Sequence, residues 1–328
     1  MAISRVLIIK LGALGDVIIA TSVIRQILAA HGNDEVWLLT SAPFIDLFST
    51  WPALHVHTVR RHGFAHTTGT IAWIRRQRFA RIYDLQSNDR TALLCALSGA
   101  PMRIGNHPRY PYTHHPTTPH RKDEHGFGRL QLMLAAAGLP PAEERPYLPA
   151  TEDARAQVEL WILERGLAAR PFAVMHSGAS PRWPAKRWPG YADLAARVEE
   201  HGVKVVWLGA GADAAINAQL AQRAGIDATD RFSIPALAEL ARHARFAVTN
   251  DSGPMHALAT AGISVYAFFG PTDWRRSHAL GQREHVLFNP GPCTACARAD
   301  RAAAADHTCL PGISVEQVMT RLHREGIL

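Results

Sequence analysis

The chain has 328 residues, of which 47% are hydrophobic and 19% are charged. This length favours two domains of about 150 residues each, and this apolar content excludes a disordered chain. The formal net charge of +7 favours anionic partners, but no basic helix or aromatic RNA-binding signature accompanies it, so we expect no nucleic-acid partner.

The N-terminus is apolar, but Lys10 and Asp16 interrupt the apolar run and no small-residue cleavage site follows. We therefore expect neither a signal peptide nor a membrane span. Four cysteines provide no framework of disulfides, which suits a reducing compartment. These features predict a cytoplasmic protein.

Strand and helix patterns alternate along the first half of the chain. The apolar run at residues 5–10 predicts a strand buried on both faces. A glycine-bearing turn follows it, and then apolar residues recur at helical spacing from Val17 to Leu28. Further strands are predicted at 35–40 and 80–85. This alternation indicates a parallel sheet with helices on both faces.

The segment from Arg103 to Lys122 is rich in proline, histidine, arginine and tyrosine. We interpret it as a long surface loop, and long ordered loops in compact domains usually serve binding. A helix is predicted to start within residues 148–152 and to end near Gly166, and we place the domain linker there.

A second alternating series follows the linker. Its predicted strands cover residues 172–176, 204–208, 246–249 and 264–269, and its predicted helices cover residues 191–201, 214–224 and 234–243. We therefore predict an α/β protein with two Rossmann-like domains facing a central cleft, at residues 1–160 and 168–312. A last helix, at 314–326, has a capping box and one apolar stripe, and we expect it to cross back to the first domain.

The first turn contains Gly12 and Gly15, which permit a tight passage from strand to helix, and Asp16 at the helix start. The spacing is not the dinucleotide fingerprint, which argues against a nucleotide-dependent oxidoreductase. Asp16 either caps the helix or presents a carboxylate at the edge of the sheet where ligands bind in open α/β folds. In the second interpretation it is suited to act as a general base.

Three polar turns follow predicted strands in the second half. The turn at 250–256 opens a helix, and it is either an ordinary cap or a diphosphate site. The turn at 176–180, followed by Lys186, offers hydroxyl and ammonium groups to phosphate oxygens or is merely solvated. The third, at 269–273, contains a Gly-Pro pair that an ordinary turn is sufficient to explain.

Together these motifs, in this order, resemble glycosyltransferase family 9, the heptosyltransferases of lipopolysaccharide synthesis. The matching stretches are KLGALGD, HSGAS with AKRWP, NDSGPMHALA and FGPTD. The resemblance runs from about residue 5 to residue 325. It implies a GT-B architecture, with the acceptor on the N-terminal domain and an ADP-sugar on the C-terminal domain.

The resemblance also implies roles for individual residues. Asp16 looks like the family's catalytic base, and Lys186 looks like its donor-phosphate lysine and second catalytic group. The family's D-[ST]-G-x-x-H stretch, which holds the diphosphate and the sugar, is matched by Asp251, Ser252, Gly253 and His256. Further donor-binding positions are Ser177, Ser180 and Asp213, the last as an acidic residue on the ribose.

For the acceptor, we expect Gly15 and the cations Arg109, Arg121 and Lys122 to bind carboxylate and phosphate groups. The alternative for this loop is a solvated proline-rich segment. The expected partners are an ADP-sugar, an anionic lipid-linked oligosaccharide and the inner face of the cytoplasmic membrane.

The implied reaction is an inverting, metal-independent transfer of heptose from ADP-heptose to the lipopolysaccharide inner core, without a cofactor. A transferase of the same family with another nucleotide sugar or a protein acceptor, and a non-catalytic module that binds nucleotide sugars, remain alternatives. Three cysteines, Cys293, Cys296 and Cys309, lie with His307 at partial zinc-site spacing. They form either a structural metal site or idle thiols, and we expect no metal there.

Overall fold

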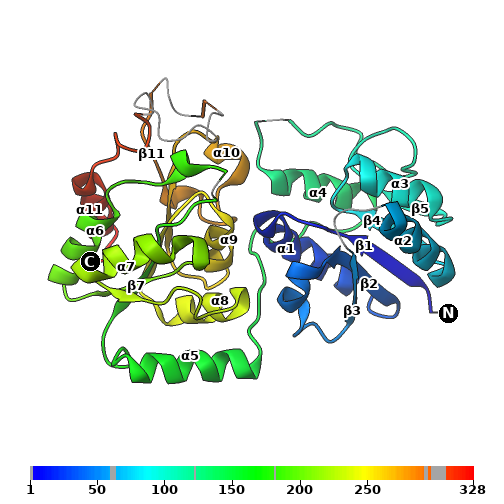
Figure 1. Cartoon of the computed structure of the whole chain (residues 1–328). Coiled ribbons are helices and arrows are strands. Elements are labelled where there is room, and N and C mark those ends of the chain that lie inside the picture. The colour runs from blue at the N-terminus through cyan, green and yellow to red at the C-terminus, as the bar shows by residue number, and fades with distance from the viewer. Residues whose placement is uncertain (1–2, 60–63, 122, 181, 292–294, 297–307) are drawn as a thin grey trace. The chain divides into compact units, whose positions relative to one another are not determined.

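The computed structural model of the chain describes residues 3–59, 64–121, 123–180, 182–291, 295–296 and 308–328 (Figure 1). The chain divides into two compact units, Met1–Leu148 and Pro149–Leu328. Among the described helices, none combines the length and the apolar character needed to cross a membrane.

The first unit is built on a parallel sheet of five strands in the order β3-β2-β1-β4-β5. Its strands are β1 (Arg5–Ile9), β2 (Glu35–Ser41), β3 (Leu54–Val59), β4 (Arg81–Asp84) and β5 (Met102–Ile104). Its helices are α1 (Leu14–Ala30), the 3-10 helix η1 (Ala42–Phe48), α2 (Phe64–Gln77), α3 (Asp89–Leu97) and α4 (Gly126–Ala136).

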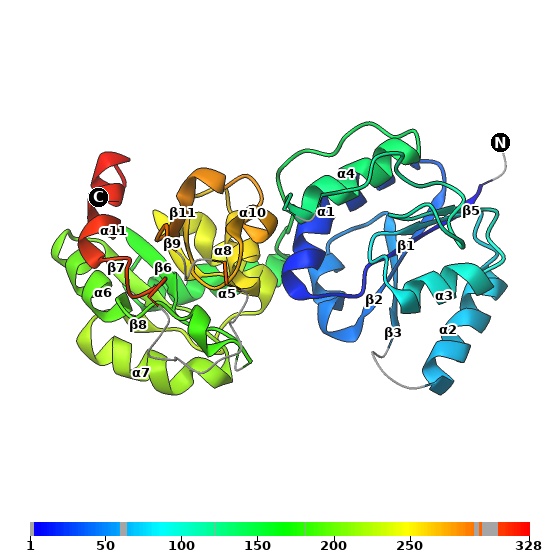
Figure 2. The same cartoon turned by 90° about the horizontal axis from the view of Figure 1, so that it is seen from above.

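Helices cover both faces of this sheet. The pair α1 and α4 lies on one face and the pair α2 and α3 on the other (Figure 2). Four consecutive residues of β1, from Val6 to Ile9, are fully buried. Leu7 and Ile9 pack against the α2 and α3 side, where Ile74 and Leu94 complete the core. A strand enclosed on both faces therefore requires the continuous apolar run that the sequence shows.

The second unit has a parallel sheet of six strands in the order β11-β10-β9-β6-β7-β8. The strands are β6 (Phe172–His176), β7 (Lys204–Trp207), β8 (Ile226–Asp227), β9 (Phe246–Asn250), β10 (Val265–Phe269) and β11 (Val286–Phe288). The α-helices are α5 (Glu152–Glu164), α6 (Tyr191–Glu200), α7 (Ala214–Arg223), α8 (Ile234–His243), α9 (Gly253–Ala259), α10 (Trp274–Ser277) and α11 (Val315–Arg324). Short 3-10 helices are η2 (Pro184–Lys186), η3 (Gly211–Asp213) and η4 (Arg283–His285).

Two parallel sheets, each with helices on its faces, confirm the predicted α/β class with two Rossmann-like domains. The position of the boundary differs from the prediction, because α5 packs against α8 and so belongs to the second unit.

The prediction for the C-terminal helix is wrong. The apolar stripe of α11 is buried within the second unit, where Val318, Met319 and Leu322 join the core formed with α6 and the sheet. The stripe does need a partner, as the sequence indicated, but the partner is the nearest sheet in the sequence and not the first domain.

Candidate functional site

The carboxyl ends of three neighbouring strands bring together the polar turns of the second unit. β9 pairs with β6 on one side and with β10 on the other, so the turns after His176, Asn250 and Phe269 share one edge of the sheet. This is the edge at which ligands bind in open parallel sheets.

At this edge Lys186 and Asp251 form an ion pair. The Nζ atom of Lys186 lies 2.6 Å from Oδ2 of Asp251. The hydroxyl group of Thr272 donates to the same carboxylate oxygen at 2.6 Å. Three segments that are separate in the sequence therefore meet at one carboxylate, and Asp251 is largely buried there. Thr272 lies in the FGPTD stretch, where sequence reasoning assigned no role to it.

Asn250 connects the two turns that flank the ion pair. Its fully buried side chain donates to the carbonyl oxygens of Ser177 and Gly178, at 2.9 and 3.0 Å. Its Oδ1 atom accepts a hydrogen bond from the backbone N–H of Trp188 at 3.1 Å. Sequence reasoning missed this positioning role, and the only available signal was a polar amide at the end of an apolar strand.

Ser252 and His176 lie next to each other at the start of α9. Ser252 is the N-cap residue, but its side chain makes no capping hydrogen bond. Its Oγ atom lies 3.3 Å from Nδ1 of His176 instead. Burial lowers the pKa of His176 to about 4; the like charge of Arg187 acts in the same direction, while Asp213 opposes the shift. The His176 imidazole is therefore neutral at neutral pH. The predicted donor residues Gly253 and His256 lie in α9, which starts directly after Ser252.

Asp213 lies against the turn after β6. A guanidinium N–H of Arg187 donates to its carboxylate at 3.1 Å, and its Oδ2 lies 3.9 Å from Nε2 of His176. A side chain at position 178 would place its Cβ 2.5 Å from the Asp213 carboxylate, so only glycine fits there. The predicted donor-site carboxylate is thus near the other donor residues, and an arginine already neutralises it.

The two predicted serines differ in their placement. Ser177 is buried, and its hydroxyl group donates to Oδ1 of Asn217 at 2.9 Å. In this structure the hydroxyl proton is therefore used inside the unit, and a role of Ser177 at a phosphate stays a prediction. Ser180 is exposed at the same edge.

In the first unit, Asp16 stands in the first turn of α1. Its Oδ2 atom accepts a hydrogen bond from the backbone N–H of Ala13 at 3.2 Å, and the side chain is exposed. The preceding turn is held by Gln86, whose Oε1 accepts from the N–H groups of Leu11 and Gly12 at 3.0 and 3.2 Å. Asp16 thus caps its helix and also presents a carboxylate to solvent, so the two interpretations of the sequence are compatible.

The predicted surface loop after β5 is partly a buried structure. Tyr112 is 7% exposed, and its hydroxyl group donates to the buried carboxylate of Asp84 at 2.6 Å. The guanidinium group of Arg103 donates to the carbonyl oxygens of Pro111 and Ala100. Both side chains fix the loop instead of facing a ligand.

Of the predicted acceptor residues, Gly15 lies in the first turn of α1 beside Asp16. Arg109 is exposed. Arg121 is also exposed, and Asp123 pairs with it at 3.0 Å, so its charge is balanced locally. Lys122 lies outside the described residues.

The predicted cysteine cluster is described only in part, because Cys293 and His307 lie outside the described residues. Cys309 is buried, and Cys296 is half-buried.

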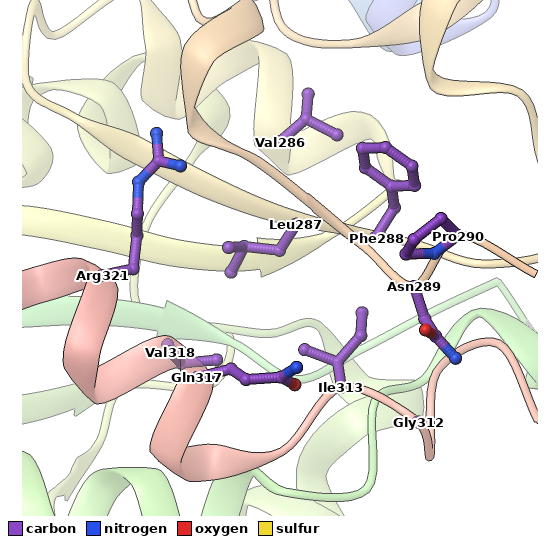
Figure 3. A pocket seen from close by; sticks show the side chains of 10 residues that line it. All are labelled: Val286, Leu287, Phe288, Asn289, Pro290, Gly312, Ile313, Gln317, Val318 and Arg321. Carbon is purple, nitrogen blue, oxygen red and sulfur yellow. The ribbon is translucent and has the colours of Figure 1, made fainter.

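A cavity of about 290 Å³ lies elsewhere in the second unit, between β11 and α11 (Figure 3). Val286, Phe288, Ile313 and Val318 give it mostly apolar walls, with Arg321 on one side. None of the predicted donor residues lines it.

Comparison with known proteins agrees with the arrangement of these motifs. Lipopolysaccharide heptosyltransferase 1 of Pseudomonas aeruginosa is 30% identical over 133 residues, which cover 38% of this chain and 36% of that protein. The chain thus matches about a third of the length of this curated relative.

Solved structures share the fold over nearly the whole chain. A family 9 glycosyltransferase from Veillonella parvula has a TM-score of 0.81 at 21% identity, covering 98% of this chain and 96% of that one. The heptosyltransferase WaaC of E. coli with ADP-2-deoxy-2-fluoro heptose has a TM-score of 0.69 at 17% identity, covering 98% and 99%. At these identities the likeness shows the fold alone, which is of the GT-B type.

The family assignment comes from the sequence. The family described as "Glycosyltransferase family 9 (heptosyltransferase)" matches residues 70–305, which is well over half of the chain. This range includes three of the four motifs, while KLGALGD precedes it. The match confirms the resemblance to the family, and the chain belongs to glycosyltransferase family 9.

Proposed function

We propose that this protein transfers a heptose from ADP-heptose to the inner core of lipopolysaccharide, with inversion at the anomeric carbon and without a metal ion. The name of the Pseudomonas relative supports the acceptor, and the ADP-heptose analogue in the E. coli structure supports the donor. The observation that carries the proposal is the cluster of Lys186, Asp251 and Thr272 at the carboxyl edge of the second sheet.

This cluster is suited to a departing diphosphate. Within the described chain, the Lys186 ammonium donates only to the backbone carbonyl and the carboxylate of Asp251, so its third N–H group can bind a phosphate oxygen. Negative charge grows on the β-phosphate as ADP leaves, and a fixed ammonium stabilises that charge. Ser180, Ser252, Gly253 and His256 complete the proposed donor site, and Asp213 is proposed to bind the ribose.

Asp16 is proposed to be the general base. Its carboxylate accepts the proton of an acceptor hydroxyl group while that oxygen forms the new bond to the anomeric carbon. The bond from this carbon to the β-phosphate oxygen breaks at the same time, and ADP departs with the electron pair. The backbone contact with Ala13 fixes one carboxylate oxygen and leaves the other for the proton.

We further propose that the protein works in the cytoplasm and touches the inner face of the membrane, because its acceptor is lipid-linked. The net charge of +7 favours an anionic surface of this kind. Gly15, Arg109, Arg121 and Lys122 are proposed to contact the acceptor.

A nucleotide screen and a transfer assay test the proposal. Thermal shifts with ADP, UDP, GDP and CDP should show preferential stabilisation by ADP. ADP-heptose and a heptose-free lipopolysaccharide core should then give ADP and a product heavier by one heptose in mass spectrometry. Stabilisation by another nucleotide would overturn the donor assignment. Binding of ADP without transfer to any acceptor would favour the non-catalytic module.

A further inference from the structure

Lys10 is a lysine that protein encloses almost completely, directly after the last residue of β1. Its side chain is 2% exposed. Within the described residues, its ammonium group donates no hydrogen bond and forms no ion pair. Burying an ammonium group without acceptors is unfavourable, because the group loses its hydration and gains nothing in return. A bound anion would compensate the charge of a lysine in such a position.

Arg129 supplies a second positive charge that acts on Lys10. It lies on α4, which packs against α1, and it is half-buried. Its guanidinium group also makes no hydrogen bond or ion pair with any described residue. Burial, together with the charge of Arg129, lowers the pKa of Lys10 to about 8, while Asp16 and Asp84 oppose the shift.

Neither nearby carboxylate hydrogen-bonds to the Lys10 ammonium. Asp84 accepts hydrogen bonds from the Tyr112 hydroxyl at 2.6 Å and from the Ser87 N–H at 2.8 Å. Asp16 accepts from the Ala13 N–H and otherwise faces solvent. Lys10 therefore interacts electrostatically with the cation Arg129 and with the carboxylate of Asp16, and among the described residues neither cation is hydrogen-bonded to an anionic group.

We propose that Lys10 and Arg129 form a subsite for an oxyanion of the acceptor, either a carboxylate or a phosphate group, beside Asp16. The identity of the ligand as an acceptor rests on the proposed function. A charge-assisted bond at this subsite would hold the acceptor so that its hydroxyl group meets Asp16. The subsite differs from the loop that the sequence favoured, where Asp123 already pairs with Arg121.

Lysine NMR provides a test that does not depend on activity. The chain contains four lysines, at positions 10, 122, 186 and 204. In protein labelled at lysine, the signals are assigned with the conservative variants Lys122→Arg, Lys186→Arg and Lys204→Arg. The Lys10 ammonium is then titrated from pH 6 to 10 in chloride and in sulfate at equal ionic strength. Sulfate should raise the pKa of Lys10 in a saturable manner and leave that of Lys204 unchanged.

Arg129→Gln should raise the pKa of Lys10 in chloride. It should also weaken the affinity for sulfate, measured from the shift of this pKa, on the order of tenfold. Arg76→Gln, at an exposed arginine in the last turn of α2, is the matched control and should change neither quantity. If Arg129→Gln misfolds, Arg129→Lys retains the charge and should retain most of the response. A Lys10 signal that does not respond to sulfate, or an equal loss of response in Arg76→Gln, would overturn the subsite.

Kinetics identify which oxyanion is bound. Arg129→Gln should raise the acceptor KM on the order of tenfold while the KM for ADP-heptose stays unchanged. The same comparison is made with an acceptor that lacks phosphate and with one whose carboxylates are esterified. The acceptor that lacks the bound group should have a KM that no longer differs between the unchanged protein and Arg129→Gln. If no transfer occurs with any acceptor, the proposed function fails, whereas the sulfate titration still decides the subsite. An unchanged acceptor KM in Arg129→Gln would contradict the proposal.

Discussion

Lys186 and Asp251 lie 65 positions apart in the sequence, and Nζ of the first is 2.6 Å from Oδ2 of the second. The pair joins the loop after β6 to the turn after β9, at the edge where Thr272 arrives from β10. A charge held in this way needs no reorganisation when a phosphate binds, which is the condition for electrostatic stabilisation of a leaving group.

Lys186→Gln should weaken ADP binding by about tenfold or more, because one charge-assisted hydrogen bond is lost and Asp251 is left without its cation. Isothermal titration calorimetry measures this effect. The control is Lys204→Gln, which removes the lysine that pairs with Glu199 at 2.9 Å and should leave ADP binding unchanged. Equal weakening in both variants would show that net charge, and not this site, governs binding.

Asp16→Asn should reduce turnover on the order of a hundredfold or more, because the general base is lost. Asparagine keeps an oxygen for the Ala13 N–H, so the cap of α1 is retained and ADP affinity should not change. Steady-state kinetics and the thermal midpoint separate the two effects. Full activity in this variant would remove Asp16 from the mechanism.

Asn250→Ala should lower the free energy of unfolding by about 3 kcal/mol, because the carbonyl groups of Ser177 and Gly178 and the N–H of Trp188 lose a buried partner. Urea denaturation measures the change. Asn33→Ala, at an exposed turn, is the control and should change stability by less than about 0.5 kcal/mol. A stable Asn250→Ala protein would mean that the two turns do not depend on this amide.

His176 should make stability sensitive to acid. Its pKa is about 4 in the folded protein and 6.5 when unperturbed, so the unfolded chain binds the proton more readily. The contribution is therefore complete above about pH 6.5 and is lost as the pH falls towards 4, by up to about 3 kcal/mol. Urea denaturation at several pH values should show a shallower dependence in His176→Gln. Identical slopes in the two proteins would contradict this assignment.

Leu322→Ala should lower the free energy of unfolding by about 2–5 kcal/mol, because the side chain is fully buried in the core of the second unit. Leu163→Ala, whose side chain is 64% exposed, should change stability by less than about 0.5 kcal/mol. Hydrogen exchange should show the loss of protection in β6, β7 and α6. Loss of protection in the first unit instead would restore the original expectation for the C-terminal helix.

The sequence was sufficient where a local pattern carries the information. β6 and α8 begin and end at the predicted residues. A continuous apolar run marks the strand, and a cap followed by an amphipathic pattern marks the helix. Four strands were missed, β3, β5, β8 and β11, and the last three have only two or three residues each, which are too few for a pattern. The polar helix α2 was missed for lack of a clear apolar stripe.

Lys186 and Asp251 were singled out because each lies in a motif, and the structure pairs them at one edge of the second sheet. The roles predicted for them and for Asp16 stay predictions. Asn250 and Gln86 were not assigned, since their partners lie 73 and 75 positions away and pairings of that kind depend on the folded sheet. The predicted end of the first domain differs from the structure for a related reason, because the packing of α5 against α8 cannot be read from the sequence of α5 alone.

The junction between Leu148 and Pro149 separates two uninterrupted stretches of chain, and each keeps all strands of its own sheet. Since α11 completes the core of the unit in which it is encoded, each of the two cores is built from its own stretch of the described residues. A gene fusion at this junction could therefore exchange one half for that of a related enzyme without breaking a sheet. Recombination at one point would then be enough to combine one half of an existing enzyme with the other half of a relative.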